Sequence, residues 1–316
     1  MPELLTRRTV LTASLGAAAS LSAAALLPGP AFARAANDPV TVTRLGDSLW
    51  LFQGAGGNVV AAGGRDGLLL VDSGVAERSA ELLKRISAET GGHRIETLVN
   101  THWHWDHTGG NEAIGKSGAT LIAHENTKLW LGTEVISKWE ERTYAPRPPR
   151  ALPTKTFFYG TQQVNFGNVA IEYGLLPDAH TDGDIYVFFP RENVLVGGGV
   201  VSGGSYPIAD YCTGGWVGGM MSGLKTLIAK SDANTRIVSG LGPLRTRADL
   251  QAQLDMCFSV LTRIGESYYK GQTWQQLVDA KPTREFDATW GNPDLFLKTA
   301  YEGAWLHINE IRRVTR

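Results

Sequence analysis

Hydrophobic and polar positions alternate over short distances through most of the chain, and this pattern predicts many short strands. Apolar runs rich in Val, Leu, Ile and Phe are bounded by glycine or charged residues, as expected for buried or half-buried strands. The pattern predicts strands at residues 40–44, 49–53, 58–62, 67–72, 95–100, 119–123, 155–159, 162–166, 169–174, 185–189, 193–198 and 235–239.

Helical periodicity separates several of these strands and dominates the C-terminal part of the chain. Helices are expected at residues 75–90, from residue 109, from residue 124 and over most of residues 247–316. In the last region, apolar residues recur at helical spacing at Leu250, Leu254, Phe258 and Leu261. The order of strands and helices is that of an α/β protein.

The first residues form a segment that we exclude from the fold. Arg7-Arg8 precedes a small and apolar run, and Ala31-Phe32-Ala33 matches the A-x-A pattern of a cleavage site. The segment resembles a bacterial twin-arginine export signal over residues 1–36. Export would place the mature domain, residues 37–316, in the periplasm or outside the cell. The alternative is an uncleaved membrane anchor, although the apolar run is short.

Length and composition allow one large domain, or two smaller ones, with a sizeable core. The chain has 316 residues, of which 43% are hydrophobic, and a formal net charge of −1 at pH 7. This balance gives no reason to expect nucleic acid as a partner, or a membrane once the signal is cleaved. We expect a small-molecule substrate, and the sequence does not indicate the oligomeric state. Cys212 and Cys257 could pair in an oxidising compartment, although Cys257 is expected in a helical core.

The candidate chemistry is concentrated in H-x-H-x-D-H at residues 102–107, directly after a predicted buried strand. Side chains two positions apart share a face in extended backbone, so His102, His104 and Asp106 point the same way. His107 has the opposite parity, and the glycine pair that follows is expected to turn it toward the others. Imidazole and carboxylate ligands at this spacing favour a zinc site over a solvated polar loop.

This motif resembles the signature of the metallo-β-lactamase superfamily, and the likeness extends over nearly all of the mature chain. Residues 178–184, Asp-Ala-His-Thr-Asp-Gly-Asp, resemble the family segment Pro-Gly-His-Thr-x-Gly-Asp. The resemblance implies that His180 completes the first zinc site with His102 and His104. It also implies that Asp184 orients this loop.

The resemblance further implies a fold. Members of this superfamily form a four-layer αβ/βα sandwich, with the metal at the open edge between two sheets. Asp72 lies in a Val-Asp-Ser-Gly stretch whose aspartate supports the metal loop in this family. A helix N-cap is the alternative role for Asp72.

Two positions depart from the family pattern, and both belong to the second metal site. Gly199 stands where the family has an aspartate that bridges two metals, and Leu241 stands where it has a metal-binding histidine. Asp106 and His107 are what remains of that site. We therefore expect one zinc ion on the three histidines and a second site that is weak or empty. Asp210 or Cys212 folding back as a replacement ligand is the alternative.

The resemblance implies a metallo-hydrolase of the β-lactamase or lactonase type. Zinc would generate hydroxide, Asp106 would orient it or accept its proton, and a cyclic amide or ester would be opened. The alternative is a non-catalytic zinc-binding pseudoenzyme. A nuclease of the same superfamily fits less well, because it needs two metals to hold a phosphodiester.

Two further segments have open interpretations. Arg142–Pro153 is rich in Pro and Arg and is expected to be a surface loop, either a flap over the site or a solvated connection. His124 follows a predicted strand. It is expected to be exposed, with a position facing the substrate as the alternative.

Overall fold

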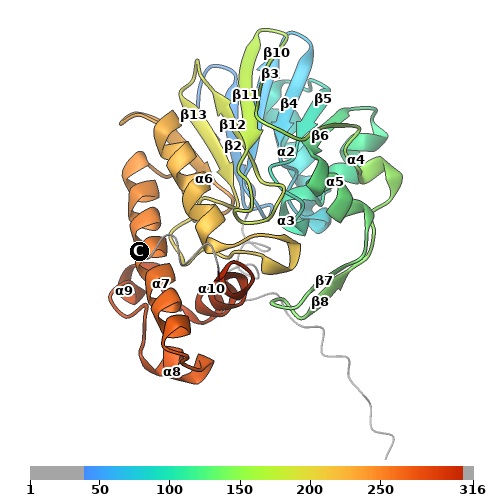
Figure 1. Ribbon diagram of the computed structural model, residues 1–316. Helices are drawn as coiled ribbons and strands as arrows, with labels where there is room; N and C mark the ends of the chain where they lie inside the picture. Colours follow the sequence, from blue (N-terminus) through green and yellow to red (C-terminus); the bar gives the residue numbers. More distant parts are fainter. Residues whose placement is uncertain (1–38, 309–316) are drawn as a thin grey trace, which may run out of the picture.

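The computed structural model describes residues 39–308, and two β-sheets lie at its centre (Figure 1). The seven-stranded sheet has the order β1-β2-β3-β4-β5-β6-β9, and the five-stranded sheet runs from β10 to β14 in sequence order. The first sheet consists of β1 Thr41–Arg44, β2 Leu49–Gln53, β3 Val59–Gly64, β4 Gly67–Val71, β5 Ile95–Val99, β6 Thr120–His124 and β9 Lys155–Phe157. The second consists of β10 Thr161–Phe166, β11 Val169–Leu175, β12 Ile185–Phe189, β13 Val194–Gly198 and β14 Arg236–Ser239.

Side-chain alternation along the strands builds the layers. In β12, Ile185, Val187 and Phe189 join the core between the two sheets, whereas Tyr186 joins the core on the outer face. β4 divides its side chains in the same way. Each buried apolar side chain of this size contributes about 1.5–3 kcal/mol, so this pattern fixes which face of each strand points inward.

Helices cover the outer face of both sheets (Figure 1). Helix α2 (Ser79–Thr90) and α4 (Asn111–Lys116) pack on the first sheet. Helix α6 (Val217–Lys230) covers the second, and α7 (Arg247–Tyr269) and α10 (Asp294–Leu306) pack against α6 in the same core. The predicted four-layer αβ/βα sandwich is therefore confirmed. The other helical elements are η1 Ala76–Arg78, α3 Trp105–Thr108, α5 Glu125–Gly132, η2 Pro149–Ala151, η3 Tyr211–Thr213, α8 Trp274–Asp279 and α9 Asp287–Trp290.

The structure differs from the sequence prediction in four places. The H-x-H-x-D-H motif was expected to be extended as far as Asp106, but Trp105–Thr108 is helix α3. Residues 142–153 are not a plain loop, because Arg142–Tyr144 is β8 and pairs with β7, Val135–Ser137, to form a hairpin. Helix α6 was not predicted. His124 is buried, where its Nδ1 accepts a hydrogen bond from Asn126 N and caps α5.

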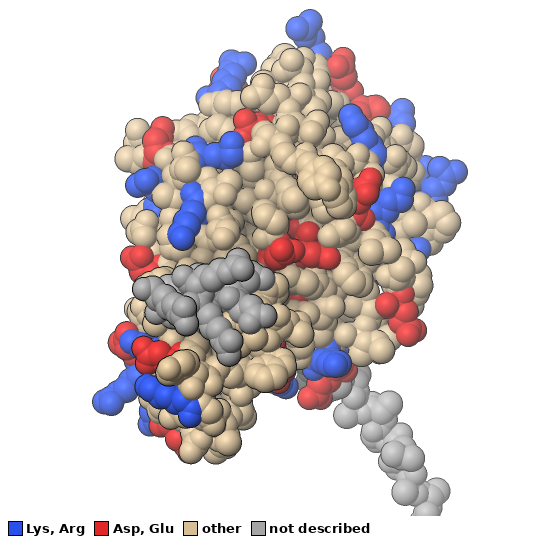
Figure 2. All heavy atoms as spheres, viewed as in Figure 1, with Lys and Arg blue, Asp and Glu red and all other residues tan. Residues whose placement is uncertain are grey.

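On the face drawn in Figure 2, Lys and Arg side chains are scattered rather than gathered into one basic patch. Among the described residues, no helix has the length and apolar character needed to cross a bilayer. The predicted export signal, residues 1–36, lies outside the described residues.

Cys257 is buried in the core beside α6, as expected, and both cysteines are free.

Candidate metal centre

The loop after β5 carries the predicted motif and is held in place by Asp72. Thr101 donates two hydrogen bonds to this carboxylate, from its backbone N to Oδ1 and from Oγ1 to Oδ2, each at 2.7 Å. Asp72 lies directly after β4 and adopts a left-handed φ of 62°, which aims its side chain at the neighbouring strand end. The supporting role predicted for Asp72 matches this geometry.

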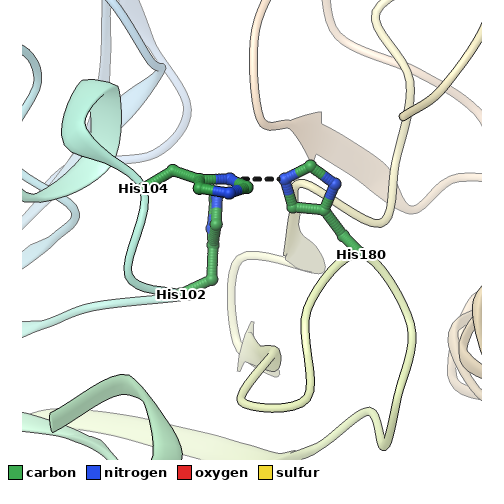
Figure 3. A group of neighbouring side chains, drawn as sticks. All are labelled: His102, His104 and His180. Atoms are coloured by element: carbon green, nitrogen blue, oxygen red, sulfur yellow. Dashed lines mark hydrogen bonds between the residues drawn. The ribbon is translucent and has the colours of Figure 1, made fainter. Parts of the chain in front are cut away.

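His102, His104 and His180 meet at one point between the two sheets (Figure 3). One ligand nitrogen of each lies within 4.8 Å of the others, and all three side chains are buried. His102 and His104 come from the loop between β5 and α3, and His180 comes from the loop between β11 and β12. His104 Nδ1 faces His180 Nε2 at 2.8 Å. The structure thus brings together the three histidines that the sequence predicted.

The ring nitrogen of each histidine that points away from the cluster has a hydrogen-bond partner, and this partner fixes the tautomer of the ring. His104 Nε2 lies 3.1 Å from Asp210 Oδ2, and His180 Nδ1 lies 2.6 Å from the carbonyl oxygen of Ile208, so each of these nitrogens carries the proton. His102 Nδ1 donates to Thr101 Oγ1 at 3.0 Å, because that hydroxyl gives its own proton to Asp72. In neutral rings held this way, the three inward nitrogens would each offer a lone pair to a metal ion.

The 2.8 Å contact between His104 Nδ1 and His180 Nε2 is a hydrogen bond, and a bound metal ion would take the place of its proton. The donor set of three imidazole nitrogens with hydrogen-bonded outer partners is also that of catalytic zinc sites. These residues therefore fit a zinc ion.

The pKa values of the rings follow from burial and from their neighbours. Burial lowers the pKa of His180 to about 3 and that of His102 well below its usual value, and the other histidines add to both shifts. Burial also acts to lower the pKa of His104, but the hydrogen bond and charge of Asp210, aided by Glu140, outweigh it and raise that pKa. A divalent ion among the rings favours the neutral form of all three.

Asp106 and His107 lie beside the three histidines without joining their cluster. The His107 ring centroid is 4.3 Å from that of His102, and its Nδ1 donates to Asp72 Oδ2 at 2.7 Å. His107 Nε2 is 3.6 Å from Asp106 Oδ2. Burial acts to lower the pKa of His107, but the charges of Asp106 and Asp72 raise it to about 9. His107 can thus serve as a cation between two carboxylates.

Gly199 lies against the ring of His180. A Cβ at this position would be 2.2 Å from His180 Cδ2, far inside van der Waals contact. The glycine that replaces the family's bridging aspartate is therefore needed for the observed place of the His180 ring. Leu241 lines the same cavity, on a loop that Asn58 fixes through hydrogen bonds to Ser239 O and Gly242 O.

Asp210 is fully buried and contacts the outer side of His104. Its Oδ2 also accepts a hydrogen bond from Thr213 Oγ1, and its Oδ1 accepts one from Trp139 Nε1 at 2.8 Å. Because Oδ2 contacts the nitrogen that points away from His180, Asp210 orients a ligand rather than replacing one. Cys212 is engaged elsewhere, since its Sγ accepts a hydrogen bond from Lys138 N. Sequence reasoning missed the role of Asp210.

Asp184 orients the loop that carries His180, as predicted. It accepts hydrogen bonds from the backbone N and Oγ1 of Thr181, the residue after the histidine. Burial raises the pKa of Asp184 to about 8, although these hydrogen bonds oppose the shift.

A cavity of about 350 Å³ opens onto the three histidines and Asp106. Trp105, Trp139 and Glu140 line one part of it, and apolar or small residues line the rest. The latter include Val201, Gly203, Tyr206, Pro207, Ile208 and Leu241.

The family to which this chain is similar agrees with the geometry of the site. The family model described as the metallo-beta-lactamase superfamily matches residues 53–252. The chain belongs to this superfamily. The match covers the loops that carry His102, His104 and His180. Superfamily members named by the comparisons include hydrolases, so a hydrolase of this fold is supported at a coarse level.

Individual superfamily relatives are distant. A metallo-beta-lactamase type 2 from Bacillus cereus is 22% identical over 225 residues, which cover 69% of this chain and 82% of that protein. A hydroxyacylglutathione hydrolase from Idiomarina loihiensis is 34% identical over 80 residues, which cover 25% of this chain and 30% of that protein.

Solved structures give the same superfamily fold. A metallo-beta-lactamase from Pontibacter korlensis has a TM-score of 0.56 at 19% identity, covering 69% of this chain and 98% of that one. A double mutant of the sec-alkyl sulfatase PisA1 has a TM-score of 0.60 at 16% identity, covering 79% of this chain and 47% of that one.

Proposed function

We propose that the protein is a zinc-dependent hydrolase that uses a single zinc ion and opens a cyclic amide or ester, such as a β-lactam or a lactone. The observation that supports this most directly is the convergence of three imidazole nitrogens on one buried point beside an open cavity. His102, His104 and His180 would hold the ion. When bound, zinc polarises a carbonyl and lowers the pKa of a water molecule to about 7.

Asp106 is the residue we assign to proton handling. It is buried and lines the cavity next to the histidines, so its carboxylate can orient a water molecule and accept a proton from it. His107 holds Asp106 from the other side, at 3.6 Å. We assign His107 to charge balance, because Gly199 and Leu241 leave Asp106 and His107 without the other usual ligands of a second metal.

A single zinc site agrees with the packing around Gly199. A bridging carboxylate at this position would overlap the ring of His180 as it now lies. The two replaced residues therefore fit an arrangement in which only the first site is used.

The second candidate function is a non-catalytic zinc-binding protein. Gly199 and Leu241 favour it, because both changes remove groups that act on the second metal. Retention of Asp106 and His107 favours the enzyme, since a structural zinc site needs neither.

Metal content and turnover measured on one sample test the proposal. After mild dialysis, elemental analysis is expected to give about one zinc per chain. The same sample is expected to hydrolyse a chromogenic β-lactam, a lactone or a thioester, and His102→Ala is expected to lose both zinc and turnover. Zinc without turnover of any of the three would favour the non-catalytic protein, and two tightly held metals would contradict the single-site proposal.

A further inference from the structure

The turn of the β7–β8 hairpin brings a carboxylate and an indole to the cavity. Glu140 and Trp139 lie between the two strands and line the cavity together with Trp105 of α3. Trp139 is fixed by its hydrogen bond to Asp210, and its ring centroid lies 6.1 Å from that of His104. The hairpin therefore places a hydrogen-bonded tryptophan in the cavity lining, close to the three histidines.

Glu140 keeps much of its hydrogen-bonding capacity for the cavity. Its two oxygens each lie 2.9 Å from the hydroxyl oxygen of Tyr144, but that hydroxyl has only one proton to donate. A carboxylate has about four acceptor sites. No other hydrogen bond and no ion pair involves Glu140 within residues 39–308. This half-buried carboxylate therefore forms no salt bridge with a described residue, and its charge helps to raise the pKa of His104.

Apart from the proposed metal ion and His107, the described residues that line the cavity supply no positive charge to receive an anionic substrate. None of the described residues that line it is Lys or Arg. Arg142 follows on the same hairpin, but its guanidinium lies over the rings of Trp105 and Tyr144, at 5.3 and 4.7 Å from their centroids. A substrate carboxylate placed beside Glu140 would meet a like charge.

The rest of the cavity lining includes the aromatic ring of Tyr206 and several apolar side chains. The hydroxyl of Tyr206 is turned away from the cavity and donates to Asp287 Oδ1 at 2.8 Å. The indole of Trp139, the ring of Tyr206 and the carboxylate of Glu140 line the same cavity, and such groups favour an ammonium group because ring faces and carboxylate both attract a positive charge.

We propose that Glu140 determines specificity, and that the cavity prefers an ester, lactone or amide bearing a cationic amine over one bearing a carboxylate. This inference rests on the proposed hydrolase function and narrows it. Penicillins and cephalosporins carry a carboxylate beside the ring nitrogen, so they are expected to be poor substrates. Amine-bearing or uncharged lactones and thioesters are expected to be better.

Two isosteric thioesters test the charge preference directly. Acetylthiocholine and 3,3-dimethylbutyl thioacetate have the same shape and differ in one positive charge. With zinc-loaded protein, kcat/KM is expected to be about tenfold higher for the cationic ester. Glu140→Gln is expected to bring the ratio close to one by slowing the cationic ester more than the neutral ester. Glu141→Gln, the exposed neighbour on the same turn, is the matched control and is expected to keep the ratio.

A binding measurement separates this proposal from the hydrolase proposal. Benzyltrimethylammonium is unreactive, and its binding beside Trp105 and Trp139 is expected to change tryptophan fluorescence. Its Kd is expected to be about tenfold weaker for Glu140→Gln and unchanged for Glu141→Gln, at constant ionic strength.

The outcomes are distinct. A ratio near or below one in the wild-type protein, or a ratio that survives Glu140→Gln, overturns the role of Glu140. If neither thioester is hydrolysed, the hydrolase proposal fails on that test. In that case the benzyltrimethylammonium titration alone decides whether Glu140 selects cations, and equal Kd values in wild type and Glu140→Gln overturn it.

Discussion

Single residues outside the three histidines decide how the metal is held. Gly199 leaves room for the His180 ring, and Asp210 fixes the ring of His104 from behind. Neither contact involves the metal directly. Both set where a ligand nitrogen points, which is the usual task of groups that surround metal ligands.

Gly199→Asp is expected to weaken zinc binding by about tenfold or more, rather than to create a second site. The new Cβ would lie 2.2 Å from His180 Cδ2, so the ring must move away from the other ligands. Elemental analysis of dialysed protein measures zinc per chain. Gly199→Ala is expected to act in the same direction, since the added Cβ is shared. Two zinc ions per chain in the aspartate variant would show that the His180 loop adapts.

Asp210→Asn is expected to weaken zinc binding by roughly 10–100-fold. The amide lacks the charge that keeps the proton on His104 Nε2 and leaves Nδ1 free for the metal. Competition with a chromogenic chelator measures the affinity. Asp287→Asn is the control, because Asp287 accepts a hydrogen bond from Tyr206 and no hydrogen bond within residues 39–308 joins it to a histidine. Equal affinities for the two variants would argue against the positioning role.

The sequence predicted the ligands themselves but not these supports. His102, His104 and His180 were identified because they stand in short motifs whose spacing is visible in the letters. Asp210 contacts a histidine that is 106 residues away in the sequence, and no local pattern encodes such a contact. The same holds for Glu140, whose approach to the cavity depends on a hairpin that was predicted as a loop.

At the level of elements, α6 and the β7–β8 hairpin shape the site most. Helix α6 carries three glycines, at positions 218, 219 and 223, and this glycine content suppressed the helical prediction because glycine disfavours helices. A side chain would meet a close neighbour at all three positions, and a Cβ at Gly218 would lie 2.2 Å from Trp216 Cη2. A Cβ at Gly219 would lie 1.8 Å from Asp178 O, and one at Gly223 would lie 3.2 Å from Val200 Cγ1.

Gly219→Ala is expected to lower the free energy of unfolding by about 1–3 kcal/mol, even though alanine favours helices over glycine. Overlap with Asp178 O must push α6 away from the loop that precedes His180. Urea denaturation measures the change. Ser222→Ala, on the exposed side of the same helix, is expected to stay within about 0.5 kcal/mol. A stabilised Gly219→Ala protein would show that α6 is packed more loosely than described.

The strands were predicted well for a physical reason. Alternation within β4 and β12 sorts side chains between two cores, and that period of two is readable in the sequence. The hairpin was missed because β7 and β8 are three residues each and lie outside both main sheets. Such short strands carry too few positions for alternation to be recognised.

In the whole molecule, the ligand set spans two halves. His102 and His104 follow a strand of the first sheet, and His180 precedes a strand of the second. The apolar core between the sheets holds the halves together, and a metal on these three residues adds a link at the edge of that core.

Removal of zinc is therefore expected to lower the thermal stability of the whole domain. A ligand at 100 times its Kd stabilises the folded state by about 2.7 kcal/mol, which corresponds to roughly 5–10 °C in Tm for a domain of this size. Thermal melts with and without a chelator measure the shift. His180→Ala is expected to show almost none, and an equal shift in that variant would place the stabilising metal elsewhere.

The two oxygens of Asp210 face different parts of the molecule. One contacts His104, and the other accepts the indole proton of Trp139 on the cavity wall. A small molecule that shifts Trp139 therefore also acts on the group that orients a metal ligand. Binding free energies are reciprocal, so any compound whose affinity depends on bound zinc must change the zinc affinity by the same factor. Zinc retention can thus report which compounds enter the cavity, without any need for turnover.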